Sequence, residues 1–202
     1  STSDLIMILK KVFECSLELG KLPKSMSTTY YKLLYKKGSF TAHEIATGAL
    51  HDSPNDPRLL ANWRPIALIP CDSKLLSAYT AQSIKQYMSD IISPQQSAFV
   101  PGRSIMDNVM LIQMLVHHHM TNAEKAGLIF LDFAHAYDYI SQEYIFSVLE
   151  AMHFPNELLN IIKISMANQV GRVIVNSDLT EAFRVENGGK QGDPLFPLIY
   201  IA

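Results

Sequence analysis

Residues 128–133, with the sequence LIFLDF, limit the fold of this 202-residue chain more than any other stretch. The run follows Gly127 and is continuously apolar up to Asp132. Such a run is typical of a short strand that is buried on both faces. An unpaired carboxylate cannot be buried there, because its desolvation costs several kcal/mol. We therefore expect the strand to end at Asp132, where the carboxylate either reaches solvent or binds a cation.

Other segments with strand patterning lie on both sides of this run. Residues 28–35 (TTYYKLLY) are β-branched and aromatic, and residues 64–70 (RPIALIP) form an extended run between prolines. The sequences RVIVN and EAFRVEN predict two hairpin strands around SDLT. Between the first two strands, the long segment 39–61 contains no helix or strand pattern, so we expect a functional or mobile loop or an insertion.

Apolar residues at helical spacing predict several helices. The first covers residues 4–19 with Asp4 as N-cap, and another covers about 73–90 after Asp72. Ser104 and Asp107 form a capping signal for a helix that ends near residue 125. One helix begins at Ser141 and runs to about residue 152, the run PNELLNIIKISMAN forms another, and a last one begins near Gln191. The residues of the second helix that we expect to face inward are Leu75, Leu76, Tyr79, Ile84, Tyr87 and Met88. The alternation of helices and strands indicates an α/β or α+β protein.

Composition limits the possible functions less than the distribution of charge does. The net charge is −2 and the pI about 6.4, whereas dedicated nucleic-acid binders are usually basic. Between Glu18 and Glu44, however, five lysines occur without an acid: Lys21, Lys24, Lys32, Lys36 and Lys37. They form either a solvated face or a local site for phosphate.

Other features place the chain in a reducing compartment. Two cysteines cannot build a disulfide framework. We find neither a signal peptide nor an apolar run of about 18 residues, so we expect no membrane partner and a location in the nucleus or cytoplasm. The chain starts without Met and ends in the apolar run PLFPLIYIA, so we expect it to be a piece of a longer protein.

Five motifs occur in one order: YKKG, NWRPIALI, SPQQSAFVPGRSIMDN, LDFAHAYD and GGKQGDPLFPLIY. Together, over roughly residues 20–202, they resemble the reverse transcriptase domain of non-LTR (LINE-type) retrotransposons. The resemblance implies an α+β right-hand polymerase fold, mostly helical with a small antiparallel palm sheet. It also implies an upstream helix and fingers-like region over residues 1–126 and a partial palm over residues 127–202.

The resemblance assigns the metal site to the end of the apolar run. Asp132 would be the catalytic carboxylate that binds Mg²⁺, or alternatively Mn²⁺, and the backbone carbonyl of Phe133 would be a second ligand. Mg²⁺ prefers oxygen ligands of this kind. Tyr137 would lie beneath the incoming sugar and exclude a 2′-OH, unless it is an ordinary core aromatic. Asp138 would hold the turn into the next helix.

The resemblance also assigns residues to phosphate. Lys36 and Arg64 would hold the triphosphate, and Gln191 and Gly192 would reach the nucleotide and the template base pair. Lys37 and Arg103 would contact template phosphate, although Arg103 has an ordinary loop arginine as its alternative.

Some positions depart from the family pattern. His135 and Tyr139 stand where the family has basic residues, Phe196 replaces a serine, Ala98 replaces a glycine, and the 39–61 segment is longer than usual. The three consecutive histidines 117–119 point 100° apart on a helix, so they cannot share one metal ion.

The resulting prediction is an RNA-directed DNA polymerase domain. Its partners would be an RNA template, a DNA primer or target, dNTPs and the remainder of a retrotransposon polyprotein. Residues 133–202 contain no adjacent carboxylate pair, so we expect an aromatic-x-Asp-Asp motif downstream and no activity from this chain alone. The alternatives are a catalytically dead nucleic-acid-binding remnant and a structural helical protein.

Overall fold

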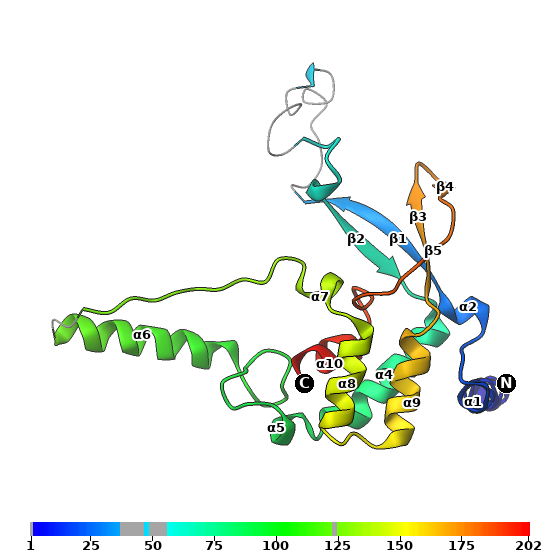
Figure 1. Cartoon of the computed structure of the whole chain (residues 1–202), viewed down its shortest axis with the longest axis horizontal. Helices are drawn as coiled ribbons and strands as arrows, with labels where there is room; N and C mark the ends of the chain where they lie inside the picture. Colours follow the sequence, from blue (N-terminus) through cyan, green and yellow to red (C-terminus); the bar gives the residue numbers. More distant parts are fainter. Residues whose placement is uncertain (1, 37–46, 49–55, 123–124) are drawn as a thin grey trace.

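The computed structural model describes residues 2–36, 47–48, 56–122 and 125–202 (Figure 1). Most of the 39–61 segment, and Lys37, therefore lie outside the described residues. The elements are α1 (Thr2–Leu19), α2 (Lys24–Ser27), β1 (Thr28–Tyr35), η1 (Leu60–Asn62), β2 (Trp63–Leu68), α4 (Cys71–Lys85), α5 (Met88–Ile91), α6 (Ile105–Thr121), α7 (Ala136–Tyr139), α8 (Gln142–Ala151), α9 (Asn156–Met166), β3 (Val170–Val175), β4 (Asp178–Leu179), β5 (Phe183–Arg184) and α10 (Phe196–Ile201).

The sheet has the strand order β2-β1-β3-β4, and β5 also pairs with β3. The predicted strand over 28–35 is confirmed. The predicted hairpin is confirmed in part: β3 pairs with β5 in EAFRVEN, but Asp178 and Leu179 of SDLT, the predicted connection, form the further strand β4. The expected small antiparallel sheet is wrong in one respect, because β1 and β3 run parallel. A parallel pair needs a long connection, and here the whole helical body, α4 to α9, lies between the two strands in sequence.

The larger core lies among α4, α8, α9 and α10. Met88, Leu149 and Ile162 are its most deeply buried side chains, at 0–1% exposure. A second cluster joins Leu22 and Met26 to α4 and α9. The core and the sheet each contain residues from before and after position 126. The division into a fingers-like region and a palm region at this position stays a prediction.

The inward face predicted for residues 73–90 is confirmed in part. Leu76, Ile84 and Met88 are buried, but Leu75, Tyr79 and Tyr87 are 51–71% exposed, and α4 itself ends at Lys85. The buried stripe is completed by hydroxyl side chains instead: Ser73, Ser77 and Thr80 are each at most 3% exposed. Hydropathy alone could not place these polar residues inside. Asp72 lies in the first turn, and Pro70 takes the N-cap position.

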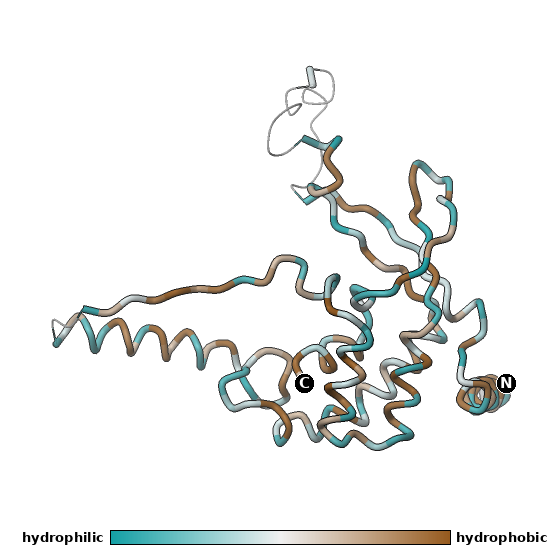
Figure 2. The backbone as a smooth tube through the Cα atoms, viewed as in Figure 1, coloured by the Kyte–Doolittle hydropathy of each residue, from teal (hydrophilic) through white to brown (hydrophobic). Residues whose placement is uncertain are grey.

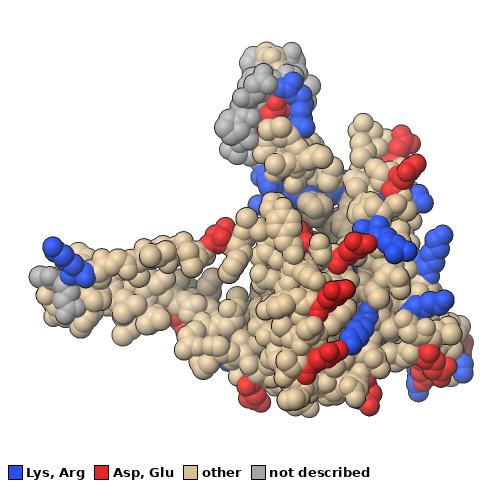
Figure 3. All heavy atoms as spheres, in the orientation of Figure 1, with Lys and Arg blue, Asp and Glu red and all other residues tan. Residues whose placement is uncertain are grey.

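Helix α6 and the chain that returns beside it form a projecting arm (Figure 1). The predicted start of α6 is confirmed: the Ser104 side chain accepts from Met106 N, and Asp107 completes a capping box. The helix ends at Thr121, four residues before the predicted end. Leu115, Val116 and Met120 line a hollow with Gly127 and Leu128, so the end of α6 and the start of the returning chain lie side by side there. The arm is largely apolar and almost bare of charge (Figures 2 and 3).

The predicted strand over 128–133 is absent, which corrects the expectation drawn from its apolar run. Residues 127–133 form neither helix nor strand, and Ile129 and Leu131 are each 86% exposed. A strand needs a neighbour that accepts its backbone hydrogen bonds, and no strand among the described residues pairs with this segment. None of the described helices is long and apolar enough to cross a membrane.

Candidate nucleotide and nucleic-acid site

Asp132 lies near the end of the exposed returning chain, just before α7. Its side chain and that of Phe133 are exposed, the latter at 78%. The carboxylate and the Phe133 carbonyl are oxygen donors of the kind that Mg²⁺ prefers. Across the described ranges, however, no three His, Cys, Asp or Glu side chains gather where they could hold a metal ion. Asp132 therefore offers one carboxylate, and a two-metal site requires more.

A tight turn connects Asp132 to α7. His135 has φ of 54°, and its carbonyl oxygen accepts hydrogen bonds from Asp138 N at 2.9 Å and Tyr139 N at 3.2 Å. The His135 ring lies 3.6 Å from the Asp138 carboxylate and 5.2 Å from the Tyr139 ring, measured between ring centroids. These contacts fit the structural role predicted for Asp138. They also show that His135 and Tyr139, two of the departures from the family pattern, pack against each other.

Tyr137 belongs to an aromatic cluster with two residues of α10. Its ring centroid lies 4.7 Å from that of Tyr200 and 5.6 Å from that of Phe196. Burial, and secondly Tyr200, raise the pKa of Tyr137. The cluster holds the half-buried ring in place from one side. A role beneath the incoming sugar stays a prediction.

Two glycines let the following turn approach this cluster. A Cβ at Gly188 would overlap the Tyr137 carbonyl oxygen, and one at Gly189 would overlap the Phe196 ring. Gly189 N instead donates to the Tyr137 carbonyl at 3.2 Å. Phe196 is 5% exposed, so its large ring fills the space that Gly189 leaves. The bulky ring at this position thus has a packing partner within the chain.

Residues 190–193 form a turn before α10, which is why the helix begins at Phe196 and not near Gln191. Asp193 N donates to the Lys190 carbonyl at 3.0 Å, and the Asp193 carboxylate accepts from Leu195 N at 2.9 Å. Gln191 is half-buried. Gly192 is exposed with φ of 100°, and no atom lies within 4 Å of the position a Cβ would take. The backbone at Gly192 is therefore open to a ligand.

Lys190 is a buried cation that the sequence did not single out. It is 7% exposed, and its ammonium has no hydrogen-bond partner among the described residues. Burial lowers the pKa of Lys190 to about 8, although the nearby Asp193 carboxylate acts to raise it. A desolvated ammonium of this kind is destabilising until an anion pairs with it.

One face of the sheet gathers positive charge. Residues that pair across neighbouring strands point to the same face, and alternate residues of one strand share a face. Tyr30, Lys32 and Leu34 thus share a face of β1, and the register places Arg172 opposite Tyr30 and Arg64 opposite Leu34.

On the same face, Arg184 of β5 pairs with Val170, two residues before Arg172. The basic sheet face is therefore Lys32, Arg64, Arg172 and Arg184, drawn from β1, β2, β3 and β5. Its paired positions include no carboxylate, since Asp178 pairs with Val175 on the opposite face. In Figure 3, Lys and Arg side chains lie over the sheet, and Asp and Glu side chains lie beside them at its β4 end. Sequence reasoning found Arg64 but missed Arg172 and Arg184, whose placement depends on the strand register.

The opposite face of the sheet is aromatic. Tyr31 stacks on Phe183 at 6.0 Å between centroids, and a Cβ at Gly171 would be 2.5 Å from the Phe183 ring. Burial, and secondly the Asp138 charge, raise the pKa of Tyr31. Because Asp138 belongs to α7, the aromatic face of the sheet lies toward α7. Arg64 lies on the basic sheet face, on the opposite side.

Lys36 ties the end of β1 to the 3-10 turn η1. Its ammonium donates to the Ala61 carbonyl at 2.6 Å, and its backbone N donates to the Asn62 carbonyl at 2.9 Å. The side chain is exposed, so binding of a triphosphate would compete with the Ala61 contact. This role for Lys36 stays a prediction, and Lys37 lies outside the described residues.

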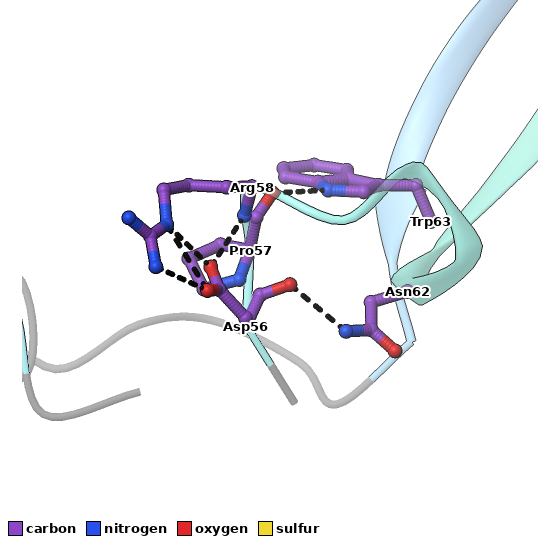
Figure 4. Close-up of polar contacts among 5 residues, drawn as sticks. All are labelled: Asp56, Pro57, Arg58, Asn62 and Trp63. Carbon is purple, nitrogen blue, oxygen red and sulfur yellow. Dashed lines mark hydrogen bonds and ion pairs between the residues drawn. The ribbon is translucent and has the colours of Figure 1, made fainter. Parts of the chain in front are cut away.

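A polar cluster fixes the entry into β2 just before Arg64 (Figure 4). Asp56 is 3% exposed and binds the Arg58 guanidinium, with its Oδ2 2.6 Å from Nη2. Asn62 donates to the Asp56 carbonyl at 2.8 Å, and the Trp63 indole donates to the Pro57 carbonyl at 2.8 Å. The cluster therefore sets the start of the strand that carries Arg64.

Arg103 is used within its own loop. Its guanidinium donates to the carbonyl oxygens of Ser89, Ile92, Ser93 and Gln96, at 2.5–3.1 Å. This geometry favours the loop-arginine alternative over the template role, because the donors that would meet phosphate are already bonded.

Comparisons with known proteins agree with this arrangement of motifs. The family described as reverse transcriptase (RNA-dependent DNA polymerase) matches residues 51–202. A 149 kDa uncharacterized protein of transposon TX1 from Xenopus laevis is 31% identical over 181 residues, 90% of this chain. A retrovirus-related Pol polyprotein from the type-2 retrotransposable element R2DM of Drosophila melanogaster is 25% identical over 69% of this chain. The matched regions make up 12% and 13% of these two relatives, so the chain spans a small part of their length.

Proposed function

Because the chain belongs to the reverse transcriptase family, we propose that it supplies the nucleotide-binding and template-binding part of an RNA-directed DNA polymerase of a non-LTR retrotransposon. In right-hand terms, residues 1–126 would supply the upstream helix and fingers-like region and residues 127–202 part of the palm, and the sheet, with β1 and β2 from the first part and β3, β4 and β5 from the second, would join the two. The substrates would be dNTPs, an RNA template and a DNA primer.

The basic sheet face is the observation that carries the proposal beyond family membership. Four cations from four strands share one face without a carboxylate among its paired positions. The chain as a whole is slightly acidic, at −2, so this concentration is local. Nucleic-acid backbones are bound mainly through such electrostatic contacts. Arg64 would hold phosphate through its forked donors, and the other three cations would follow the backbone.

Asp132 would bind the catalytic Mg²⁺, with the Phe133 carbonyl as a further oxygen ligand. Bound Mg²⁺ would activate the primer 3′-OH and neutralise charge on the leaving pyrophosphate. The exposed carboxylate has the right chemistry, and it needs further carboxylates to complete the site. Tyr137, held against Tyr200, would face the sugar, and the open backbone at Gly192 would allow the nucleotide to approach beside Gln191.

The salt dependence of nucleic-acid binding tests the basic sheet face. The affinity of the chain for a single-stranded RNA should fall linearly with the logarithm of salt concentration. Arg172→Gln with Arg184→Gln should reduce that slope by roughly 1 to 1.5, since each lost phosphate contact removes about 0.7. Lys10→Gln on α1, where the side chain is 74% exposed, is the matched control and should leave the slope unchanged. Equal slopes for all three proteins would remove the sheet face from the proposal.

A nucleic-acid-binding protein without polymerase activity is the second candidate. The observation that favours it is the placement of His135 and Tyr139, whose rings pack against each other at a tilted angle where the family has basic residues. Under this alternative the salt dependence is retained, and restoring the complete polymerase yields no DNA synthesis.

A further inference from the structure

The Arg103 guanidinium makes four of the hydrogen bonds that hold the loop between α5 and α6. Arg103 donates to four carbonyl oxygens spread over residues 89–96, and its own backbone N donates to the Val100 carbonyl at 3.3 Å. Arginine bonded in this way fixes the path of a loop that otherwise has no regular structure. The loop backbone therefore has a defined conformation, and the side chains that it exposes have defined positions.

The residue presented is Phe99. Its φ is 62°, a left-handed conformation that a bulky residue rarely adopts, and its side chain is 55% exposed. Burial of the ring therefore does not explain the strained backbone. Strain of this kind persists where surrounding contacts enforce it, often at binding sites. The Arg103 contacts hold the loop up to Gln96, and the Gln96 side chain donates to the Ala98 carbonyl at 3.2 Å, so the backbone that precedes Phe99 is fixed.

Phe99 and Tyr79 flank two adjoining surface hollows. One hollow, of about 570 Å³, is lined by Phe99 and by prolines 101, 194 and 197. The other, of about 510 Å³, is lined by Tyr79, which is 71% exposed. Gln82, Lys85 and Pro101 line both. The two hollows thus form one surface between an exposed phenol ring and an exposed phenyl ring.

Among the described residues, Lys85 is the only Lys, Arg, Asp or Glu that lines either hollow. The surface therefore carries one positive charge and no carboxylate, beside the amide side chains of Gln82 and Gln86. Exposed aromatic rings can stack on the faces of unpaired bases, and a cation can contact the phosphates between them. Amide groups can form hydrogen bonds with the edges of the bases. An apolar peptide would use the proline walls but leave the cation and the amides without partners.

We propose that this surface, the Tyr79–Phe99 platform, binds a single-stranded segment of nucleic acid. Unpaired bases stack on Tyr79 and Phe99, and Lys85 contacts the intervening phosphate. Arg103 is the positioning residue that holds Phe99. The platform deepens the proposed function, on which it rests, by adding a site for unpaired bases that is separate from the basic sheet face.

Ring substitutions with matched controls test the platform. The probe is a fluorescein-labelled 12-residue oligouridylate RNA, compared with an abasic strand of the same length, by fluorescence anisotropy. Tyr79→Ala and Phe99→Ala should each weaken binding of the oligouridylate by about 5-fold to 100-fold. Tyr79→Phe and Phe99→Tyr keep a ring and, for position 99, the same backbone requirement, so their affinities should stay within about twofold of wild type. The abasic strand should bind more weakly and respond to none of the four.

Arg103→Met tests the positioning role. It should weaken oligouridylate binding as Phe99→Ala does. The double variant, Arg103→Met with Phe99→Ala, should bind the RNA no more weakly than the weaker-binding of the two single variants, because both substitutions act through the same ring. Arg103→Lys should recover little, since an ammonium lacks the forked donors by which the guanidinium reaches four carbonyls. Circular dichroism and thermal midpoints of all variants separate loss of the ring from loss of the fold.

The outcomes distinguish the platform from the proposed function. Loss of affinity in the ring variants, with an unchanged salt slope, supports the platform. If Arg172→Gln with Arg184→Gln weakens binding while the Ala ring variants bind like wild type, the platform is refuted and the proposed function stands. Equal affinity for abasic and base-containing strands also refutes it, as does binding of an apolar proline-rich peptide in preference to the RNA.

Discussion

The Ser77 hydroxyl donates to the Asp193 carboxylate at 3.2 Å across 116 positions of sequence. The bond joins the buried polar stripe of α4 to the turn that carries Gln191 and Gly192. The other carboxylate oxygen of Asp193 accepts from Leu195 N and so caps the entry to α10. One aspartate therefore holds the predicted nucleotide-binding turn in place from two sides.

Removing this aspartate should destabilise the chain. Asp193→Ala deletes both hydrogen bonds to a charged group and should lower the free energy of unfolding by about 1.5–3 kcal/mol. Ser77→Ala should cost about 1 kcal/mol, and the double variant should show coupling in a denaturant-unfolding cycle. Ser83→Ala, on the exposed side of the same helix, is the control, because its hydroxyl donates to the Tyr79 carbonyl within its own helix and makes no bond to the turn at Asp193. If the losses of unfolding free energy in Ser77→Ala and Asp193→Ala simply added up in the double variant, the bond between the two residues would be contradicted.

Lys190 should make stability depend on pH. Its folded pKa is about 8, below the ordinary 10.5, so the unfolded chain binds more protons between these values. Stability should therefore rise as pH increases from 8 toward 10, and at pH 7 the buried charge costs on the order of 3 kcal/mol. Above pH 10 the raised pKa values of Tyr31 and Tyr137 act in the opposite direction, since the unfolded tyrosines ionise first.

Lys190→Met should stabilise the chain at pH 7 and abolish the rise between pH 8 and 10. Urea unfolding at several pH values measures both effects. Lys10→Met, at an exposed position of α1, should change neither. A wild-type stability that is flat over this window would show that the Lys190 ammonium has found a partner or solvent.

Tyr137 should affect both sugar selection and stability. In the complete polymerase, Tyr137→Ala should raise ribonucleotide incorporation relative to deoxyribonucleotide, because no ring then blocks the 2′-OH. It should also lower the free energy of unfolding by about 1–3 kcal/mol, since contacts with Tyr200 and Phe196 are lost. Tyr137→Phe keeps the ring and should behave like wild type in both assays. A stability loss with an unchanged ratio of the two kcat/KM values would make Tyr137 an ordinary packing residue.

Local signals were predictable from the sequence. The β-branched and aromatic run at 28–35 gave the bounds of β1, and Ser104 with Asp107 gave the start of α6. Both depend on neighbours within a few residues. The inward face of α4 was harder, because its buried positions include Ser77 and Thr80, which hydropathy places outside.

Features that depend on distant partners were not predictable. An apolar run such as 128–133 becomes a strand only when another strand pairs with it, and no strand within the described residues does so. Arg172 and Arg184 join Arg64 only through the strand register. Likewise, the four carbonyls that occupy Arg103 converge only once the loop is folded.

The role of Asp132 is the central claim, and primer extension on an RNA template tests it most directly. The complete polymerase that contains this chain should extend a DNA primer with dNTPs and Mg²⁺. Asp132→Asn, which keeps the shape of the side chain but removes its charge, should abolish that extension. Asp178→Asn, at an exposed position of β4, is the matched control and should retain the wild-type rate. Extension by Asp132→Asn within about tenfold of wild type would contradict the assignment of Asp132 to the catalytic metal.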